Sequence, residues 1–155
     1  MSLKNFTTHC LALMLLAFAN LALAHHGSFL IIDGAYARAV PPTAKNSGAF
    51  MLIENRGEQN RRLVDAVSDV SNVTELHTHL NDNGVMRMRK VPFIEVPAGG
   101  SVKLQPGSYH VMLIDLKKPL NDGDPVNITL TFDDGSQQTV KLQARKMMGG
   151  GHMHH

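Results

Sequence analysis

The sequence has no tryptophan, few aromatic residues and a single cysteine, and its charges nearly balance. The 15 Lys and Arg and the 13 Asp and Glu are scattered along the chain, which excludes the concentrated basic stripe of a nucleic-acid-binding protein. A chain of 155 residues with 43% hydrophobic side chains is the right size for one domain. Against these shortages stand 9 Met and 9 His, more of both than an ordinary core requires.

The N-terminus has the order of a secretory signal: Lys4, an apolar run at residues 11–23, and small residues ending at Ala24. We therefore expect residues 1–24 to be a cleaved signal peptide and the protein to be periplasmic. The run is shorter than the roughly 20 residues of a membrane-spanning helix, so no membrane span is expected. A lipoprotein signal is not expected at Cys10, because the apolar run follows this cysteine instead of preceding it.

Cleavage after Ala24 would also remove Cys10, the only cysteine. This excludes a disulfide, a cysteine nucleophile, thiol–disulfide exchange, a Cys-ligated zinc site and an iron–sulfur cluster in the exported chain. Soft-ligand chemistry then depends on Met and His. His25 and His26 would follow the cleavage site, where a free amine beside an imidazole is able to bind copper; the alternative is that both are idle.

Residues 25–145 have the pattern of an all-β domain. Short β-branched runs alternate with Gly, Asn and Pro turns, whereas helical periodicity is hard to find. Such short strands favour a Greek-key β-sandwich or small barrel. A hairpin turn is expected at residues 81–84, since the later acidic ligand of a calcium loop is missing. The predicted strands are Phe29–Val40, Gly48–Asn55, Arg62–Val67, Val73–His79, Val85–Val96, Ser101–Leu104, Tyr109–Leu113, Pro125–Asp133 and Gln138–Ala144.

Residues 146–155 have no core-forming period, and we expect them to be a flexible tail. A Gly-rich linker joined to Met and His favours metal capture, and the alternative is an idle terminus or a remnant of cloning. The soft donors of the tail are Met147, Met148, His152, Met153, His154 and His155.

Three pairs of donor residues with i, i+2 spacing lie in predicted strands. Residues i and i+2 of a strand project to the same face, so each pair offers two donors to one side of a sheet. A single strand methionine is usually core filler, and Met51 is assigned to the core on that ground. Two imidazoles with two thioethers, however, form a soft neutral ligand set that suits Cu(I) and is poor for Mg, Ca or structural zinc. The pairs are His77 with His79, Met86 with Met88, and His110 with Met112.

The spacing of these donors resembles the metal-binding motif of the periplasmic copper chaperones called PCuAC. Ten residues separate His77 from Met88, twenty-one separate Met88 from His110, and Met112 follows after one more. The resemblance covers about residues 32–143. Many members have Met directly after the first His, where this chain has Thr78 followed by His79. The flanking segments that also resemble the family are Glu75-Leu76-His77, Gly84-Val85-Met86-Arg87-Met88-Arg89, Val96-Pro97-Ala98-Gly99-Gly100, Leu104-Gln105-Pro106-Gly107 and Lys118-Pro119-Leu120.

The resemblance implies a cupredoxin-like β-sandwich that carries copper, and the soft donor set predicts that this copper is Cu(I). The resemblance also implies delivery toward the CuA centre of cytochrome c oxidase, with the oxidase subunit that carries CuA and Sco-type copper proteins as partners. Members with a His/Met-rich extension are similar to this chain in its tail, which implies a Cu(II) site there. The metal ligands that it implies are His77, Met88, His110 and Met112, with His79 and Met86 as auxiliary candidates.

The sequence thus predicts a periplasmic copper carrier without catalytic turnover. Neutral donors bind copper less tightly than thiolates, so such a carrier is able to pass its metal to a cysteine-based site. Three alternatives are copper storage or sequestration, a copper-dependent redox protein, and an adhesive sandwich whose His and Met are incidental. The last of these predicts that no copper binds.

Overall fold

The computed structural model describes residues 29–147, which form ten β-strands and no helix. The all-β prediction is therefore confirmed for this part of the chain. Residues 1–28, with the expected leader, His25 and His26, lie outside the described residues, as do residues 148–155. The strands are β1 (Leu30–Arg38), β2 (Ser47–Asn55), β3 (Arg61–Ser68), β4 (Ser71–Asp82), β5 (Val85–Lys90), β6 (Ile94–Val96), β7 (Ser101–Leu104), β8 (His110–Leu116), β9 (Pro125–Phe132) and β10 (Gln137–Arg145).

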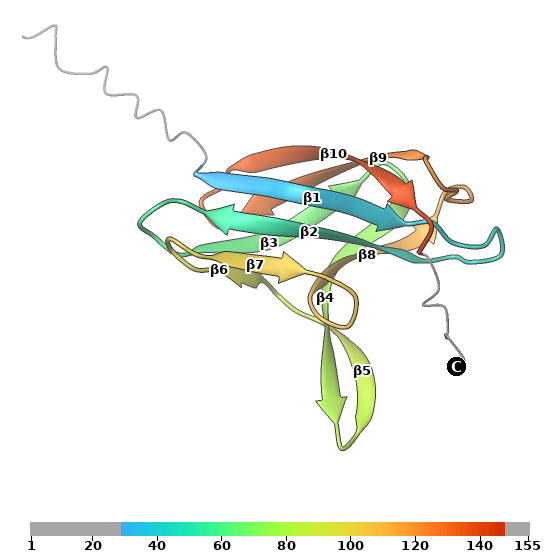
Figure 1. Ribbon diagram of the computed structural model, residues 1–155, viewed down its shortest axis with the longest axis horizontal. Helices are drawn as coiled ribbons and strands as arrows, with labels where there is room; N and C mark the ends of the chain where they lie inside the picture. Colours follow the sequence, from blue (N-terminus) through green and yellow to red (C-terminus); the bar gives the residue numbers. More distant parts are fainter. Residues whose placement is uncertain (1–28, 148–155) are drawn as a thin grey trace, which may run out of the picture.

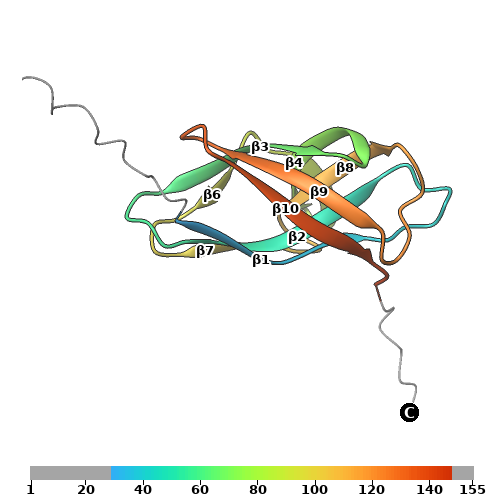
Figure 2. The same ribbon diagram turned by 90° about the horizontal axis from the view of Figure 1, so that it is seen from above.

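The strands form a single sheet in the order β5-β4-β8-β2-β1-β10-β9-β3-β6, with β7 paired to β2. All of its neighbours are antiparallel except β1 and β10, which run parallel. The sheet curls until β3 and β4 lie side by side, and Figures 1 and 2 show the resulting flattened barrel. No helix among the described residues is long and apolar enough to cross a membrane.

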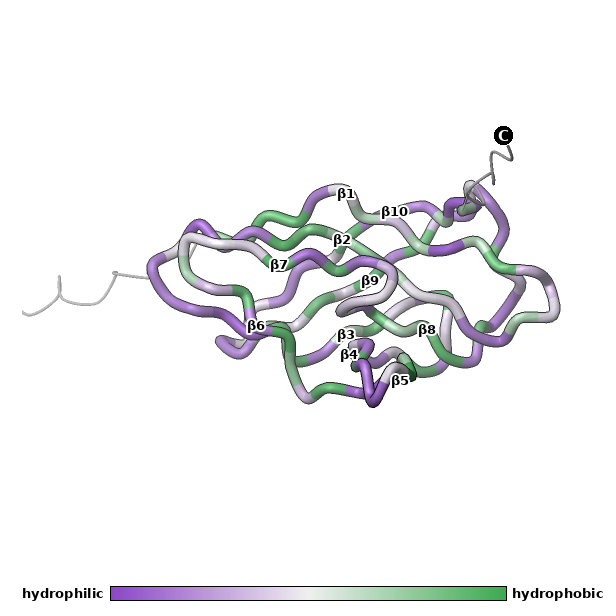
Figure 3. The backbone as a smooth tube through the Cα atoms, turned by 60° about the horizontal axis from the view of Figure 1, so that its bottom comes forward, coloured by the Kyte–Doolittle hydropathy of each residue, from purple (hydrophilic) through white to green (hydrophobic). Residues whose placement is uncertain are grey.

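Alternation of apolar and polar residues places the core inside this barrel, and Figure 3 shows the corresponding changes of hydropathy along the strands. Met51 is 2% exposed, so its assignment to the core is confirmed. A residue next to a buried one along a strand therefore points to the outer face of the barrel. One buried inner row crosses five neighbouring strands and consists of Ala144, Ala37, Ala49, Val111 and Leu76.

The prediction of one strand at Val85–Val96 is wrong. The segment forms β5, which pairs with β4, and β6, which pairs with β3. Pro92 lies between them and cannot donate a backbone hydrogen bond, so one continuous ladder is excluded. Strand β5 is an edge strand, and Figure 1 shows the β4–β5 hairpin projecting from the barrel.

The turn of this hairpin lies at Asn83 and Gly84, which confirms the expected reversal at residues 81–84. Both residues have positive φ, 52° and 87°, as the two-residue turns that match the twist of a hairpin require. The side-chain oxygen of Asn81 accepts a hydrogen bond from the Gly84 amide at 2.7 Å and braces the turn.

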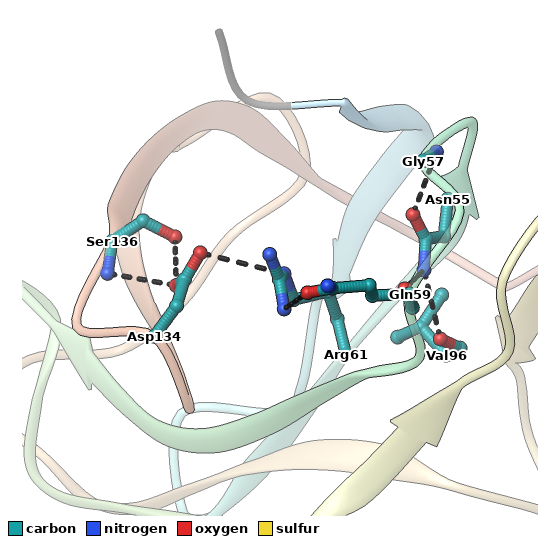
Figure 4. A network of polar contacts seen from close by, with 7 residues as sticks. All are labelled: Asn55, Gly57, Gln59, Arg61, Val96, Asp134 and Ser136. Atoms are coloured by element: carbon teal, nitrogen blue, oxygen red, sulfur yellow. Dashed lines mark hydrogen bonds and ion pairs between the residues drawn. The ribbon is translucent and has the colours of Figure 1, made fainter. Parts of the chain in front are cut away.

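A polar network lies at the C-terminal end of β2 (Figure 4). The buried side chain of Asn55 donates to the carbonyls of Gln59 and Val96 and accepts from the Gly57 amide. The Asn55 amide group thereby supplies hydrogen-bond partners to backbone groups of the loop after β2 and of β6.

Candidate metal centre

Strand β4 lies between β8 and β5 and carries the centre of the candidate site. His77 of β4 is directly opposite His110 of β8 and directly opposite Lys90 of β5. Directly opposite residues share a face of the sheet, with Cβ atoms about 4.5–5.5 Å apart. The two predicted histidine ligands are therefore cross-strand neighbours, and their ring centroids are 5.8 Å apart.

The two predicted methionine ligands lie on either side of this histidine pair. Met112 is opposite Glu75, two residues before His77, and Met88 is opposite His79, two residues after it. Diagonal neighbours on a sheet face are about 7–8 Å apart, which an unbranched thioether side chain can span. The register therefore brings all four predicted ligands to one face of β5, β4 and β8.

This face is the outer one, because Val111, between His110 and Met112, is fully buried in the core. His110 is nevertheless only 3% exposed, whereas Met88 is 47% exposed. The rings of His79 and Phe50 lie next to His110, with centroids 5.2 Å and 6.2 Å away. One side of the candidate site is thus sheltered and the other is open to solvent.

Phe50 takes this position because the residue on the same face of β2, two positions earlier, is Gly48. Gly48 is directly opposite Met112, and a Cβ at Gly48 would lie 3.2 Å from the Phe50 ring. The missing side chain leaves room for the ring, which also packs on Tyr36 at 5.2 Å. The sheltering role of Phe50 was not predicted, since nothing in the local sequence relates residue 50 to residue 110.

His110 is held in a form that can bind a metal. Its Nδ1 lies 2.9 Å from the Ser108 carbonyl oxygen, which can only accept, so Nδ1 carries the proton and Nε2 keeps its lone pair. Burial lowers the pKa of His110, although the Ser108 carbonyl opposes this effect, and nearby positive charges lower the pKa further. A neutral imidazole is the ligating form of histidine.

His77 has the complementary arrangement. Its Nε2 lies 2.8 Å from Oε2 of Glu75, while its Nδ1 is buried without a hydrogen-bond partner. The other oxygen of Glu75 accepts from Nζ of Lys90 at 2.7 Å. These hydrogen bonds, first from His77 and then from Lys90, lower the pKa of Glu75. An unpartnered buried nitrogen is costly, and a metal ion at Nδ1 would satisfy it, so the donor set fits a metal site.

Glu75 and Lys90 were not predicted as part of the site. The available signal for Glu75 was its position two residues before His77, which puts both on one face of a strand. Lys90 gave no signal, because its contact with Glu75 depends on the pairing of β4 with β5.

The auxiliary candidates differ in their positions. His79 lies beside His110, and its Nδ1 is 3.5 Å from the Ser108 carbonyl oxygen. Met86 is opposite Asn81, farther toward the hairpin tip, and is 55% exposed, so the structure does not bring it to the histidine pair.

Among residues 29–147, no three His, Cys, Asp or Glu side chains form a group that could hold a metal ion. The donors that the register adds to the histidine pair are the thioethers of Met88 and Met112. Of the predicted tail donors only Met147 is described, and it is 44% exposed. Met148, His152, Met153, His154 and His155 lie outside the described residues.

These observations define a β-barrel with a cluster of His and Met donors on its outer face, beside one edge of the sheet. The family model described as "Putative lipoprotein LpqE-like" matches residues 30–144. "Putative lipoprotein Lxx21020" of Leifsonia xyli subsp. xyli is 32% identical over 121 residues, which cover 76% of this chain and 73% of that protein. "Uncharacterized protein RP573" of Rickettsia prowazekii is 37% identical over 99 residues, 63% of this chain and 55% of that protein.

Solved structures agree with this match. The solution structure of CuI-DR1885 from Deinococcus radiodurans is 36% identical, with a TM-score of 0.63, and the match covers 77% of this chain and 80% of that one. The copper-bound PCuAC domain from PmoF2 is 21% identical, with a TM-score of 0.65, over 77% of this chain and 94% of that one, and this match shows the fold alone. The chain belongs to the LpqE-like family, which is the PCuAC family, and the predicted cupredoxin-like fold is confirmed.

Proposed function

We propose that this protein is an exported copper chaperone whose core site binds one Cu(I) through His77, Met88, His110 and Met112. The observation that carries the proposal is the register of β8, β4 and β5, which places an imidazole pair between two thioethers on one face. The buried Nδ1 of His77, which has no hydrogen-bond partner, supports it. So does the relative DR1885, whose solution structure is of the CuI form.

Copper is the cargo of such a protein, and the site is suited to releasing it. Its donors are neutral, so it binds Cu(I) less tightly than a thiolate site does. Met88 lies on the exposed edge strand, where an incoming acceptor can compete with its sulfur, while His110 stays buried. The direction of transfer that follows is from this site to a cysteine-containing acceptor.

The finer parts of the function are proposals of the same kind. The acceptor is the CuA-bearing subunit of cytochrome c oxidase, with Sco-type proteins as further partners, and the tail takes up Cu(II). Residues 1–24 direct export to the periplasm and are cleaved off after Ala24. The word lipoprotein in the names of relatives supports export, although the apolar run of this chain follows Cys10.

The test replaces both proposed thioether ligands in a chain truncated after Arg145, which keeps all ten strands. Leucine conserves the volume of methionine and removes only the sulfur. We expect Met88→Leu with Met112→Leu to lose at least tenfold in Cu(I) affinity in a competition titration under reducing conditions. The matched control is Met51→Leu, the same exchange in the core, which should bind one Cu(I) like the parent.

Cu(I) binding by the double variant as tight as that of the parent would remove Met88 and Met112 from the ligand set. A parent that binds no copper at all would support incidental His and Met. Several Cu(I) ions per truncated chain would favour storage over delivery.

A further inference from the structure

We infer that Glu75 is a positioning residue that presents Nδ1 of His77 to copper, while the Ser108 carbonyl presents Nε2 of His110. The two facing histidines then bind the metal through different ring nitrogens. This inference rests on the proposed copper site and adds to it the choice of nitrogen and the residues that make that choice.

The first step concerns His77. A neutral imidazole has one N–H group and one lone pair, and the hydrogen-bond partner decides which nitrogen carries the proton. An ionised carboxylate can only accept, so Oε2 of Glu75, 2.8 Å from Nε2, fixes the proton there. The lone pair is then on Nδ1, the nitrogen that the fold buries and leaves without a partner.

The second step concerns His110, where the acceptor lies on the other side of the ring. The Ser108 carbonyl oxygen accepts a hydrogen bond from Nδ1 at 2.9 Å, so the proton stays on Nδ1 and the lone pair is on Nε2. Because Ser108 precedes His110 by two residues in the β7–β8 loop, this choice is made by the backbone, and no side-chain substitution at residue 108 removes it.

The third step concerns Lys90, which holds Glu75 in place. Its Nζ donates to Oε1 of Glu75 at 2.7 Å, so each carboxylate oxygen has its own partner. Glu75 is only partly exposed, at 23% of its side chain, whereas Lys90 is 65% exposed. Hydrogen-bonded carboxylates behind metal-bound histidines orient the ring and raise its basicity, and their loss typically costs 10- to 100-fold in metal affinity.

The experiment reads the nitrogens directly in the full-length protein. Long-range ¹H–¹⁵N spectra of ¹⁵N-labelled protein distinguish the protonated from the bare ring nitrogen in each histidine. Without copper we expect the proton of His77 on Nε2 and that of His110 on Nδ1. On addition of one equivalent of Cu(I) under reducing conditions, Nδ1 of His77 and Nε2 of His110 should shift.

The variants separate a positioning role from a merely structural one. Glu75→Leu should mix the two proton positions of His77 and weaken Cu(I) binding about 10- to 100-fold. Glu75→Gln keeps an oxygen that accepts from Nε2, so it should retain the proton position and stay within a fewfold of wild-type affinity. Asp82→Leu is the control, because Asp82 is a carboxylate on the same hairpin that pairs with Arg87 at 3.4 Å and is hydrogen-bonded to no histidine within residues 29–147.

Cu(I) binding to His77 through Nε2 would overturn the inference, as would equal losses of affinity in Glu75→Leu and Asp82→Leu. If Glu75→Leu does not fold, the wild-type spectra and Glu75→Gln still decide the matter. Cu(I)-dependent shifts at His77 and His110 that involve the wrong nitrogens would leave the proposed site standing and refute only the choice of nitrogen. No shift at either histidine would refute the site itself.

Discussion

His77 and His110 face each other across two strands, yet their surroundings differ. His110 is almost fully buried, and burial lowers its pKa. The side chain of His77 is 15% exposed, and its Nε2 is hydrogen-bonded to the carboxylate of Glu75. At the scale of single residues, the candidate site therefore combines one histidine whose neutral form is favoured by burial with one oriented by a charged partner.

A carboxyl group outside this site, that of Asp134, also has a lowered pKa. Hydrogen bonds from Ser136, at 2.6 Å from its Oγ and 3.0 Å from its amide, hold the pKa of Asp134 below its ordinary value of 3.8, and Arg61 at 3.4 Å adds to this (Figure 4). A lowered carboxyl pKa contributes stability above pH 3.8, and this contribution is lost as the pH falls through the lowered value.

We therefore expect Asp134→Asn to reduce the free energy of unfolding at pH 6 and to have a smaller effect as the pH falls below 3.8. Urea unfolding of wild type and variant at several pH values between 2 and 6 measures this difference. A difference that is the same at every pH would show that the charge of Asp134 does not contribute.

At the scale of elements, the β4–β5 hairpin forms the solvent-exposed side of the candidate site. Among the ten described strands, β5 pairs only with β4; it is exposed along its whole length and carries Met88 and Lys90. Its turn depends on Gly84, with φ of 87°. Opening of this hairpin would remove a proposed ligand without exposing the core.

Gly84→Val should therefore weaken Cu(I) binding, because a β-branched residue at positive φ costs about 1–3 kcal/mol and opens the hairpin. Hydrogen exchange should accelerate in β5, while amides of β9, which pairs with β10 and β3, stay protected. Gly135→Val is the matched control: Gly135 has φ of 80° in the β9–β10 turn, so this variant should lose stability and keep wild-type Cu(I) affinity. Equal loss of affinity in both variants would argue against a specific role for the hairpin.

At the scale of the whole molecule, the sheet order relates the tail to the site. Strand β10, after which the tail begins, is three strand spacings from β8, about 14 Å at 4.8 Å each. His152 is the seventh residue after Arg145, and a Gly-rich chain of seven residues spans on average about 13–16 Å. A flexible tail, as the sequence predicts, would therefore reach the core site in the same molecule.

We expect truncation after Arg145 to remove one Cu(II) equivalent and to leave the core Cu(I) equivalent unchanged. Imidazoles suit Cu(II), and the tail has three of them, whereas the core site combines imidazoles with thioethers. Copper titrations of both forms under oxidising and reducing conditions measure this. Equal Cu(II) uptake by the two forms would exclude the tail as the second site and point to His25 and His26.

The local sequence was sufficient for those features that the backbone itself dictates. A period of two residues places His110 and Met112 on the face opposite Val111. Asn83-Gly84 forms a hairpin turn whatever surface the hairpin packs against. Local patterning predicted one strand at Val85–Val96, because β-branched residues occur throughout this segment. The chain instead passes at Pro92 from β5, at one edge of the sheet, to β6, at the other.

The tertiary structure decided which strands are neighbours, and with them the site. Only the placement of β8 between β4 and β2 puts His77 opposite His110, and only the β4–β5 pairing brings Lys90 to Glu75. Burial of His110 under Phe50 depends in the same way on β2. The physical reason is that side-chain alternation follows from the geometry of each strand alone, whereas strand pairing and burial follow from packing between segments that are distant in the sequence.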